Sequence, residues 1–382
     1  MMPGKTALSR YGPMDPGDVR SVPKVDASSV DIFLSAYALW SQVVDGEAIA
    51  DRGTGIDASY DAAVKLLRPH AGTFANLAPD GLEQAIAALE TEHNPVLGIF
   101  LSAALNTTEL RALAGVFREY SFLGYKLAPG KVLVARKGSS VHELGVLAEG
   151  GVLISYGMVD SFASYAKGGV QANLGFASNF GDWSSNSVRI NLGNKPGTYS
   201  GNEVKKFLNH TDDLERLSGP SRQGGYCDGV DINTGRMTGS FSEETDDKSK
   251  CFVANFGRVE GWLIPSPCDF VNCGTIETVH FEEHNPGKPS RFVNLGILRN
   301  TYSPGFMHEG SMDSRANRKS NKGIAPVMRQ MRAKVRWLDG VLSPRAGAMA
   351  EPVDRIAAYD WAGFEADVRR LAGEARAEFA QR

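Results

Sequence analysis

The sequence has few cysteines, no long apolar run and no large net charge. Only 4 of its 382 residues are cysteine, so a small secreted domain held together by disulfides is not expected. No segment reaches the roughly 18 apolar residues of a membrane-spanning helix, and residues 1–21 contain prolines and glycines where a signal peptide needs an apolar stretch. We therefore expect a cytoplasmic protein with no membrane contact.

Common enzyme signatures are missing as well. The formal net charge of -3 provides no global field that would attract nucleic acid or an anionic membrane. The sequence contains no phosphate-binding loop, no dinucleotide-binding fingerprint and no nucleophile-elbow serine, so the common nucleotide-dependent and hydrolase classes are disfavoured. Hydrophobic residues make up 42% and charged residues 22% of the chain, which is ordinary for a globular protein.

The sequence pattern divides the chain into four parts. Residues 1–25, rich in proline, glycine and charge, predict a flexible arm, and residues 26–128 predict a helical domain because apolar residues recur at three-to-four spacing. Residues 129–300 predict a glycine-rich β-repeat domain with a helical insertion near 202–216. Residues 301–382 predict a basic linker and C-terminal docking helices. The last helix has an apolar stripe that needs a packing partner, formed by Trp361, Phe364, Val368, Leu371, Ala375 and Phe379.

One short phrase recurs through the β-repeat region, at a spacing near 18 residues. Each copy is a strand of alternating apolar residues that ends in a glycine. The closing glycines are Gly138, Gly157, Gly175, Gly193, Gly235, Gly257 and Gly296. The two longest gaps, after Gly193 and after Gly257, are close to two turns each with insertion. An asparagine stands two residues before the glycine in five copies, at Asn173, Asn191, Asn233, Asn255 and Asn294.

This period favours a parallel β-helix, because one strand and one glycine corner per turn let identical side chains stack on neighbouring turns. The alternative is an antiparallel β-barrel or sandwich, in which Asn-x-Gly ends each strand at a turn. The expected fold class is thus α+β: an N-terminal helical region, the β-repeat region and C-terminal helices. In a β-helix, we expect Val170, Val188 and Val230 to point inward and the asparagines to point the other way.

The stretch from Gly150 to Gly201 resembles the repeats of the GXGXG family, the β-helix domain found in glutamate synthases and in formylmethanofuran dehydrogenases. Both combine Gly-Gly, a strand, a glycine and a corner that contains an aromatic residue. The resemblance implies a β-helix whose role is largely architectural, and it implies no catalytic residues.

The asparagine row allows two interpretations. As a structural feature, the amides hydrogen-bond between turns. As a functional feature, the row would line a groove that binds a polar ligand such as a sugar chain or a peptide. The candidate ligand-binding residues are Asn173, Asn191, Asn233 and Asn255, with Trp183 at a nearby corner.

A second candidate site is a metal centre. Cys268, Cys273, His280 and His284 supply four zinc donors within 17 residues. The spacing is not that of a zinc finger, and the alternative is that the cysteines are buried and the histidines lie on a strand. We therefore expect no cofactor, with zinc at these four residues as the alternative.

The segment from Arg315 to Arg336 contains eight lysines and arginines and no acidic residue. Such a block could neutralise phosphates of a nucleic acid. However, Trp337 is the one aromatic residue nearby, so stacking on bases is not supported. The other interpretation is a solvated linker and helix face.

Together these features favour a non-catalytic structural or assembly protein with a β-solenoid core and helical flanks, in a homo-oligomer or a larger complex. The alternative is an enzyme or ligand-binding protein that uses the β-repeat surface, with or without zinc.

Overall fold

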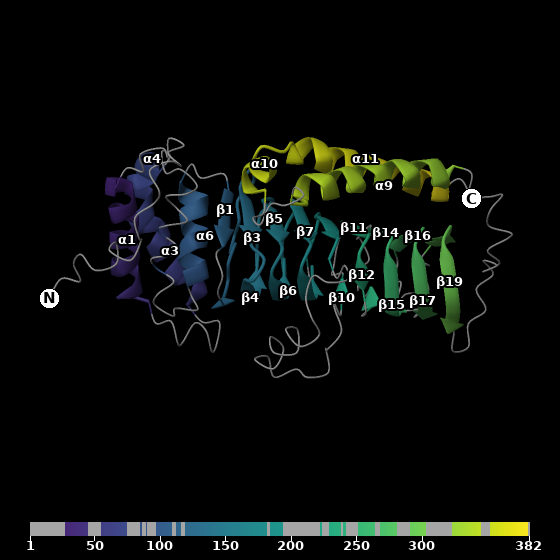
Figure 1. The fold of residues 1–382 in the computed structure, drawn as a ribbon, viewed down its shortest axis with the longest axis horizontal. Helices are drawn as coiled ribbons and strands as arrows, with labels where there is room; N and C mark the ends of the chain where they lie inside the picture. The colour runs from purple at the N-terminus through teal and green to yellow at the C-terminus, as the bar shows by residue number, and fades with distance from the viewer. Residues whose placement is uncertain are drawn as a thin grey trace, which may run out of the picture.

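In the computed structural model, the N-terminal helices stand at one end of a β-solenoid and the C-terminal helices lie along one of its sides (Figure 1). The predicted arm and the predicted insertion at 202–216 lie outside the residues that the structure describes. Those residues are 27–44, 55–74, 85, 89, 97–108, 112–115, 119–181, 184–193, 222–223, 229–237, 240–241, 251–263, 268–280, 291–302, 323–344 and 352–380. Across these ranges, no helix is long and apolar enough to span a membrane.

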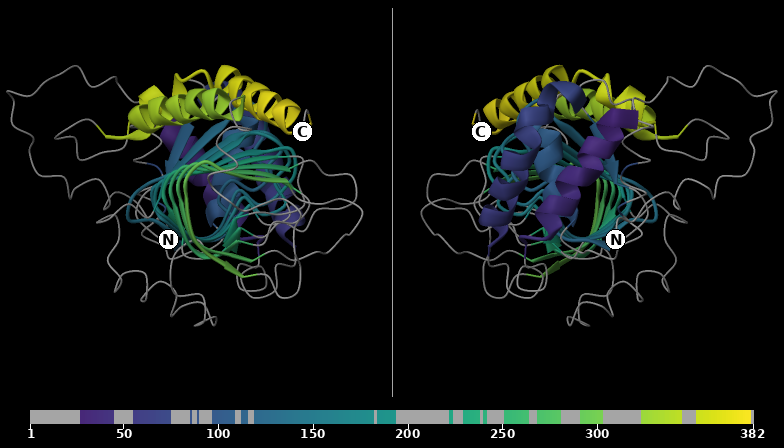
Figure 2. Two further views of the ribbon diagram at one scale, coloured as in Figure 1. Left: turned by 90° about the vertical axis from the view of Figure 1, so that its right-hand side faces the viewer. Right: turned by 90° about the vertical axis from the view of Figure 1, so that its left-hand side faces the viewer.

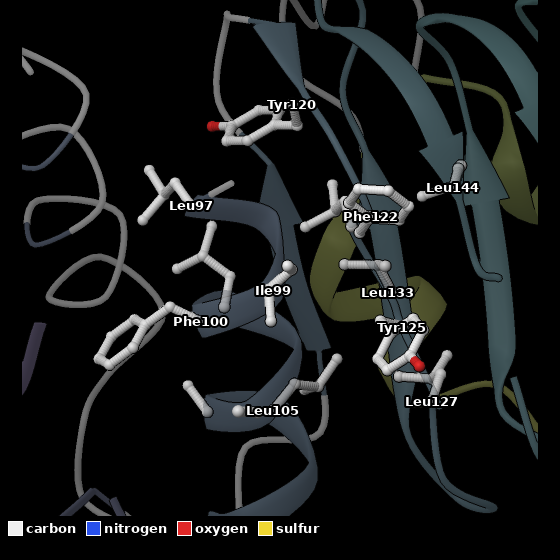
Figure 3. Packing of buried hydrophobic residues seen from close by; sticks show 14 of the residues in the cluster. Leu97, Ile99, Phe100, Leu105, Tyr120, Phe122, Tyr125, Leu127, Leu133 and Leu144 are labelled. Carbon is white, nitrogen blue, oxygen red and sulfur yellow. The ribbon is translucent and has the colours of Figure 1, made fainter. Parts of the chain in front are cut away.

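The N-terminal helices close one end of the solenoid. They are α1 (Ala27–Ser41), α3 (Ile56–Leu67), the short η2 (Arg68–His70), α4 (Ala71–Phe74) and α6 (Leu97–Thr107). Every residue of α6 from Leu97 to Leu105 is buried. Figure 3 shows Leu97, Phe100 and Leu105 on this helix, beside Leu133 and Leu144 of the first turns. A side chain at Gly98 would overlap the carbonyl oxygen of Ser121, so α6 lies directly against the strands.

The solenoid consists of three sheets in which every pairing is parallel. The first sheet contains β1 (Ala112–Gly115), β3 (Val132–Ala135), β5 (Val152–Ser155), β7 (Val170–Asn173), β9 (Val188–Asn191), β11 (Val230–Asn233), β14 (Cys251–Asn255), β16 (Cys268–Asn272) and β18 (Arg291–Asn294), in this order. The second contains β2 (Glu119–Tyr120), β4 (Ser140–Leu144), β6 (Met158–Phe162), β8 (Phe176–Phe180), β10 (Arg222–Gln223) and β13 (Ser240–Phe241). The third contains β12 (Arg236–Met237), β15 (Arg258–Leu263), β17 (Thr275–His280) and β19 (Ile297–Tyr302).

The strand order confirms the parallel β-helix and excludes the antiparallel barrel or sandwich. Asn173, Asn191 and Asn233 are Cα partners on successive strands of the first sheet, as the repeat predicts. Gly193 and Gly235 also stack, because a Cβ at Gly235 would overlap the carbonyl oxygen of Gly193. Only glycine can occupy this position, which repeats after the strands of the first sheet from β5 to β18.

The two long gaps in the repeat have different origins. The gap after Gly257 contains one further turn, whose asparagine is Asn272 and whose glycine is Gly274. The gap after Gly193 is not two turns of the first sheet, because β9 pairs directly with β11. That part of the prediction is wrong: in the first sheet, the extra residues form an insertion within a single turn.

The solenoid also begins earlier than the sequence predicts. β1, at Ala112–Gly115, pairs with β3 and starts the first sheet within the segment expected to be helical. Alanine and leucine dominate this short strand, and both favour helices in isolation. Pairing with a neighbouring strand overrides that preference.

The two faces of the first sheet are the reverse of the expectation. Val170, Val188 and Val230 are buried, but they pack in one cluster with the C-terminal helices α9 (Ile324–Leu342) and α11 (Trp361–Ala380). These helices lie outside the solenoid (Figure 2). The asparagines therefore face the interior. Strand alternation correctly predicted which residues share a face, but the face itself is turned outward and covered by helices.

The interior of the solenoid changes character along its axis. Near α6 it is apolar, with Leu133 and Leu153 buried, and near the other end it contains Val253 and Phe270. Between these regions Gln171, Arg189 and Asp231 occupy the same register position on successive strands. The guanidinium of Arg189 binds both carboxylate oxygens of Asp231, and neither side chain is exposed.

Candidate protein-binding groove on the C-terminal helices

The asparagine row forms a continuous ladder of hydrogen bonds inside the solenoid. Each Nδ2 group donates to the Oδ1 atom of the next asparagine, from Asn173 to Asn294, over 3.1, 3.0, 2.9, 2.9 and 2.8 Å. Asn173, Asn191, Asn233 and Asn255 have no exposed surface. Their amides are directed to neighbouring turns, which fits the structural interpretation. A groove lined by these four residues is not open to solvent, and Trp183 lies outside the described residues.

The predicted zinc donors are distributed over two sheets. Cys268 begins β16 of the first sheet, whereas His280 ends β17 of the third. Cys273 packs beneath the C-terminal helices, and burial raises the pKa of its thiol to about 12. His284 and the side chains of Cys268 and His280 lie outside the part that the structure describes, so the zinc site stays a prediction. Within that part, no three His, Cys, Asp or Glu residues are grouped as metal ligands.

Two acidic residues lie close together on the second sheet. Glu143 lies in β4 and Asp160 in β6, the neighbouring strand. Burial raises the pKa of the Glu143 carboxyl, and the charge of Asp160 raises it further, whereas His142 opposes the shift.

Part of the basic segment lies on α9. Residues 315–322 are outside the described part, but Arg329, Arg332, Lys334 and Arg336 are exposed on this helix. The helix forms because its apolar residues recur every three or four positions, and that stripe packs on the valine face of the first sheet. The cations lie outside this stripe, and the guanidinium of Arg332 lies over the ring of Phe256, 6.0 Å from its centroid.

Trp337 is on this exposed face of α9 and is 69% exposed. It lines a groove between α9 and the first turns of α11, together with the segment that joins α10 (Val353–Ala357) to α11. The groove has a volume of about 750 Å³. We call it the Trp337 groove; its lining residues are Gln330, Ala333, Lys334, Trp337, Tyr359, Asp360, Gly363, Phe364, Ala366 and Asp367.

Aromatic packing fixes one end of the Trp337 groove. The rings of Tyr359 and Trp361 meet edge to face, with 4.9 Å between centroids, and the indole Nε1 of Trp361 donates to the carbonyl oxygen of Ile356 at 2.8 Å. Burial raises the pKa of Tyr359. Ala333, Gly363 and Ala366 have small side chains or none, so an incoming chain can approach the helix backbones closely.

The acidic residues of the groove are already engaged. Asp367 pairs with Lys334 across the groove, and this hydrogen bond lowers the pKa of the Asp367 carboxyl. Asp360 accepts a hydrogen bond from the backbone N–H of Gly363 at 2.9 Å, at the start of α11. Arg329 and Arg336 form no ion pair with any carboxylate in the described ranges. These two exposed cations of α9 are therefore available to a negatively charged partner.

The groove combines an exposed aromatic side chain, a floor of small residues and a charged rim. These are features of a surface that binds another polypeptide. One signal for it is present in the sequence, since Trp337 follows the basic block, but the groove requires α9 and α11 to lie side by side. That arrangement could not be read from either helix alone.

Comparison of the sequence with protein-family models finds no match, and comparisons with curated proteins and with solved structures find no similar protein. The fold defines the class to which the chain belongs: a parallel β-solenoid with helical flanks.

Proposed function

We propose that the protein is a non-catalytic assembly protein in which the solenoid is a rigid support and the Trp337 groove binds a segment of another protein. The observation that carries this proposal is Trp337, a large aromatic side chain that is 69% exposed beside a groove of about 750 Å³. Such residues dominate the energy of many protein interfaces. The resemblance of residues 150–201 to the largely architectural GXGXG repeats supports the same role.

The occupant that best fits the groove is an amphipathic helix. α9 and α11 form a layer with one face on the solenoid and the other exposed, as Figure 2 shows at the top of both views. A third helix can lie between them, because ridges of side chains pack into the grooves between helices. Its apolar stripe would contact Trp337 and Phe364, and its backbone would pass over Gly363.

Charge specifies which helix would bind. Asp360 and Asp367 have partners within the protein, whereas Arg329 and Arg336 lack ion-pair partners among the described residues. An acidic flank beside the apolar stripe would complement these cations. Nucleic acid is the rival partner, but it would gain little stacking here, since aromatic residues do not alternate with the cations of α9.

The test uses two synthetic helical peptides of about 20 residues that share one leucine stripe and carry either glutamates or lysines beside it. We expect the acidic peptide to bind, with an affinity that falls as salt screens the charges. Trp337→Ala should weaken binding at least about tenfold. It should change the free energy of unfolding by no more than about 0.5 kcal/mol, because the side chain is exposed. Fluorescence anisotropy and urea unfolding measure the two quantities.

Tyr165→Ala is the matched control, since Tyr165 is an exposed aromatic residue on the solenoid. It should leave peptide binding unchanged. Equal binding of both peptides, or binding that survives Trp337→Ala, would contradict the proposal. Tight binding of a single-stranded oligonucleotide that is lost with Arg329→Ala and Arg336→Ala would favour the nucleic-acid partner instead.

The alternative function is an enzyme or ligand-binding protein that uses the β-repeat surface. Glu143 and Asp160 give one observation in its favour, because a half-buried carboxyl with a raised pKa is a feature of catalytic sites. Its zinc-dependent form predicts stoichiometric zinc in the purified protein that is lost in Cys268→Ala. Elemental analysis of both proteins distinguishes this form from the metal-free assembly protein.

A further inference from the structure

The two ends of the solenoid differ. The N-terminal end is covered by α6, whose residues from Leu97 to Leu105 are buried against the first turns. At the other end, β18 and β19 are the last strands of their sheets. Within the described residues, no strand pairs with the outer edges of β18 and β19, so the backbone N–H and C=O groups on these edges have no strand partner there.

The side chains of the last turn are more exposed than their register partners one turn earlier. Phe270 and Ile276 are completely buried, whereas their partners Phe292 and Leu298 are half-buried. Ile297 is 57% exposed. The difference arises because each turn is covered by the next, and within the described part no turn follows β19.

The asparagine ladder ends in the same place. Asn294 accepts a hydrogen bond from Nδ2 of Asn272 at 2.8 Å, and its Oδ1 also accepts from the backbone N–H of Gly296 at 3.2 Å. In every earlier rung the Nδ2 group donates to the next turn. The Nδ2 group of Asn294 has no acceptor within the described ranges, so it can donate to a strand placed beyond β18.

We propose that a second copy of this chain covers this end, and that two solenoids join through their C-terminal ends across a two-fold axis. The occupant must supply a strand edge and an apolar surface, and an identical end supplies both. Stacking of the C-terminal end on an N-terminal end is blocked by α6, so the assembly closes as a dimer and does not extend into a fibre.

Charge does not oppose this contact. Arg291 donates from Nη2 to Asp269 at 2.7 Å, and Arg299 forms an ion pair with Glu277 at 3.3 Å. The cations of the last two strands, Arg291 of β18 and Arg299 of β19, are therefore neutralised within their own chain. Two copies can approach each other without strong repulsion between like charges, and each exposed Ile297 then gains apolar contacts. The dimer would carry a Trp337 groove on each half, although its formation does not depend on the function of that groove.

The experiment is size-exclusion chromatography with light scattering on the full chain, as wild type and as Ile297→Lys. We expect the wild type at twice the mass of one chain. Ile297→Lys should halve that mass without changing the melting temperature or the circular dichroism spectrum of the monomer, because a lysine on an edge strand blocks edge-to-edge pairing.

Leu39→Lys is the matched control, since Leu39 is an aliphatic residue of similar exposure, 55%, on α1 at the opposite end of the molecule. This variant should remain a dimer. A monomeric wild type, a dimer that persists in Ile297→Lys, or polymers longer than a dimer would each overturn the proposal.

Discussion

Replacing Asp231 by alanine is expected to lower the free energy of unfolding by about 3–5 kcal/mol. Arg189 and Asp231 have no exposed surface, and the guanidinium of Arg189 binds both carboxylate oxygens. Without Asp231, the charge of Arg189 stays buried inside the solenoid beside neutral groups such as the carbonyl of Gly181 and the hydroxyl of Ser184. Urea unfolding followed by circular dichroism measures the loss.

Asp269→Ala provides the comparison. Asp269 and Arg291 form a similar bidentate pair on neighbouring strands of the same sheet, but the Arg291 side chain is 40% exposed. Solvent screens this pair, so we expect a loss of about 1 kcal/mol or less. Equal losses in the two variants would show that burial does not distinguish the pairs.

Val188→Asp is expected to have the largest effect and to prevent folding. Val188 is completely buried between the first sheet and the C-terminal helices. An aspartate there would place an unpaired carboxylate in an apolar layer, which costs more than about 4 kcal/mol. Soluble yield and the unfolding transition report the outcome. Val43→Asp makes the same substitution at a position that is 72% exposed and should be tolerated. A folded Val188→Asp variant with α9 and α11 still in place would contradict the packing.

The sequence predicted the strands better than it predicted their surroundings. Glycine spacing and the asparagine row located the turns, because both follow from the stacking of identical positions. Periodicity could not say which face of the first sheet lies inside, because the apolar face is covered by the C-terminal helices and the interior face carries the asparagine row. The apolar stripe of the last helix, Trp361 to Phe379, was the missing signal. It required a partner, and the valine face is that partner.

The buried ion pair of Arg189 and Asp231 also has a signal in the sequence. Gln171, Arg189 and Asp231 stand at one repeat position in three copies, and opposite charges on successive turns of a solenoid are within reach of each other. These opposite charges predict a buried ion pair only when the repeat position is known to face the interior of the solenoid. The Trp337 groove is harder to predict from the sequence, because it forms only where α9 packs beside α11.

The asparagine row stabilises the solenoid, and the partner protein binds to the C-terminal helices α9 and α11 instead of to this row. Hydrogen exchange of asparagine side-chain amides, followed by NMR with selectively labelled asparagine, tests this claim directly. The ladder amides of Asn173, Asn191, Asn233, Asn255 and Asn272 are hydrogen-bonded and enclosed, so they should exchange far more slowly than free amides. Exchange at the rate of solvated amides would mean that the row lines a wet groove open to a polar ligand.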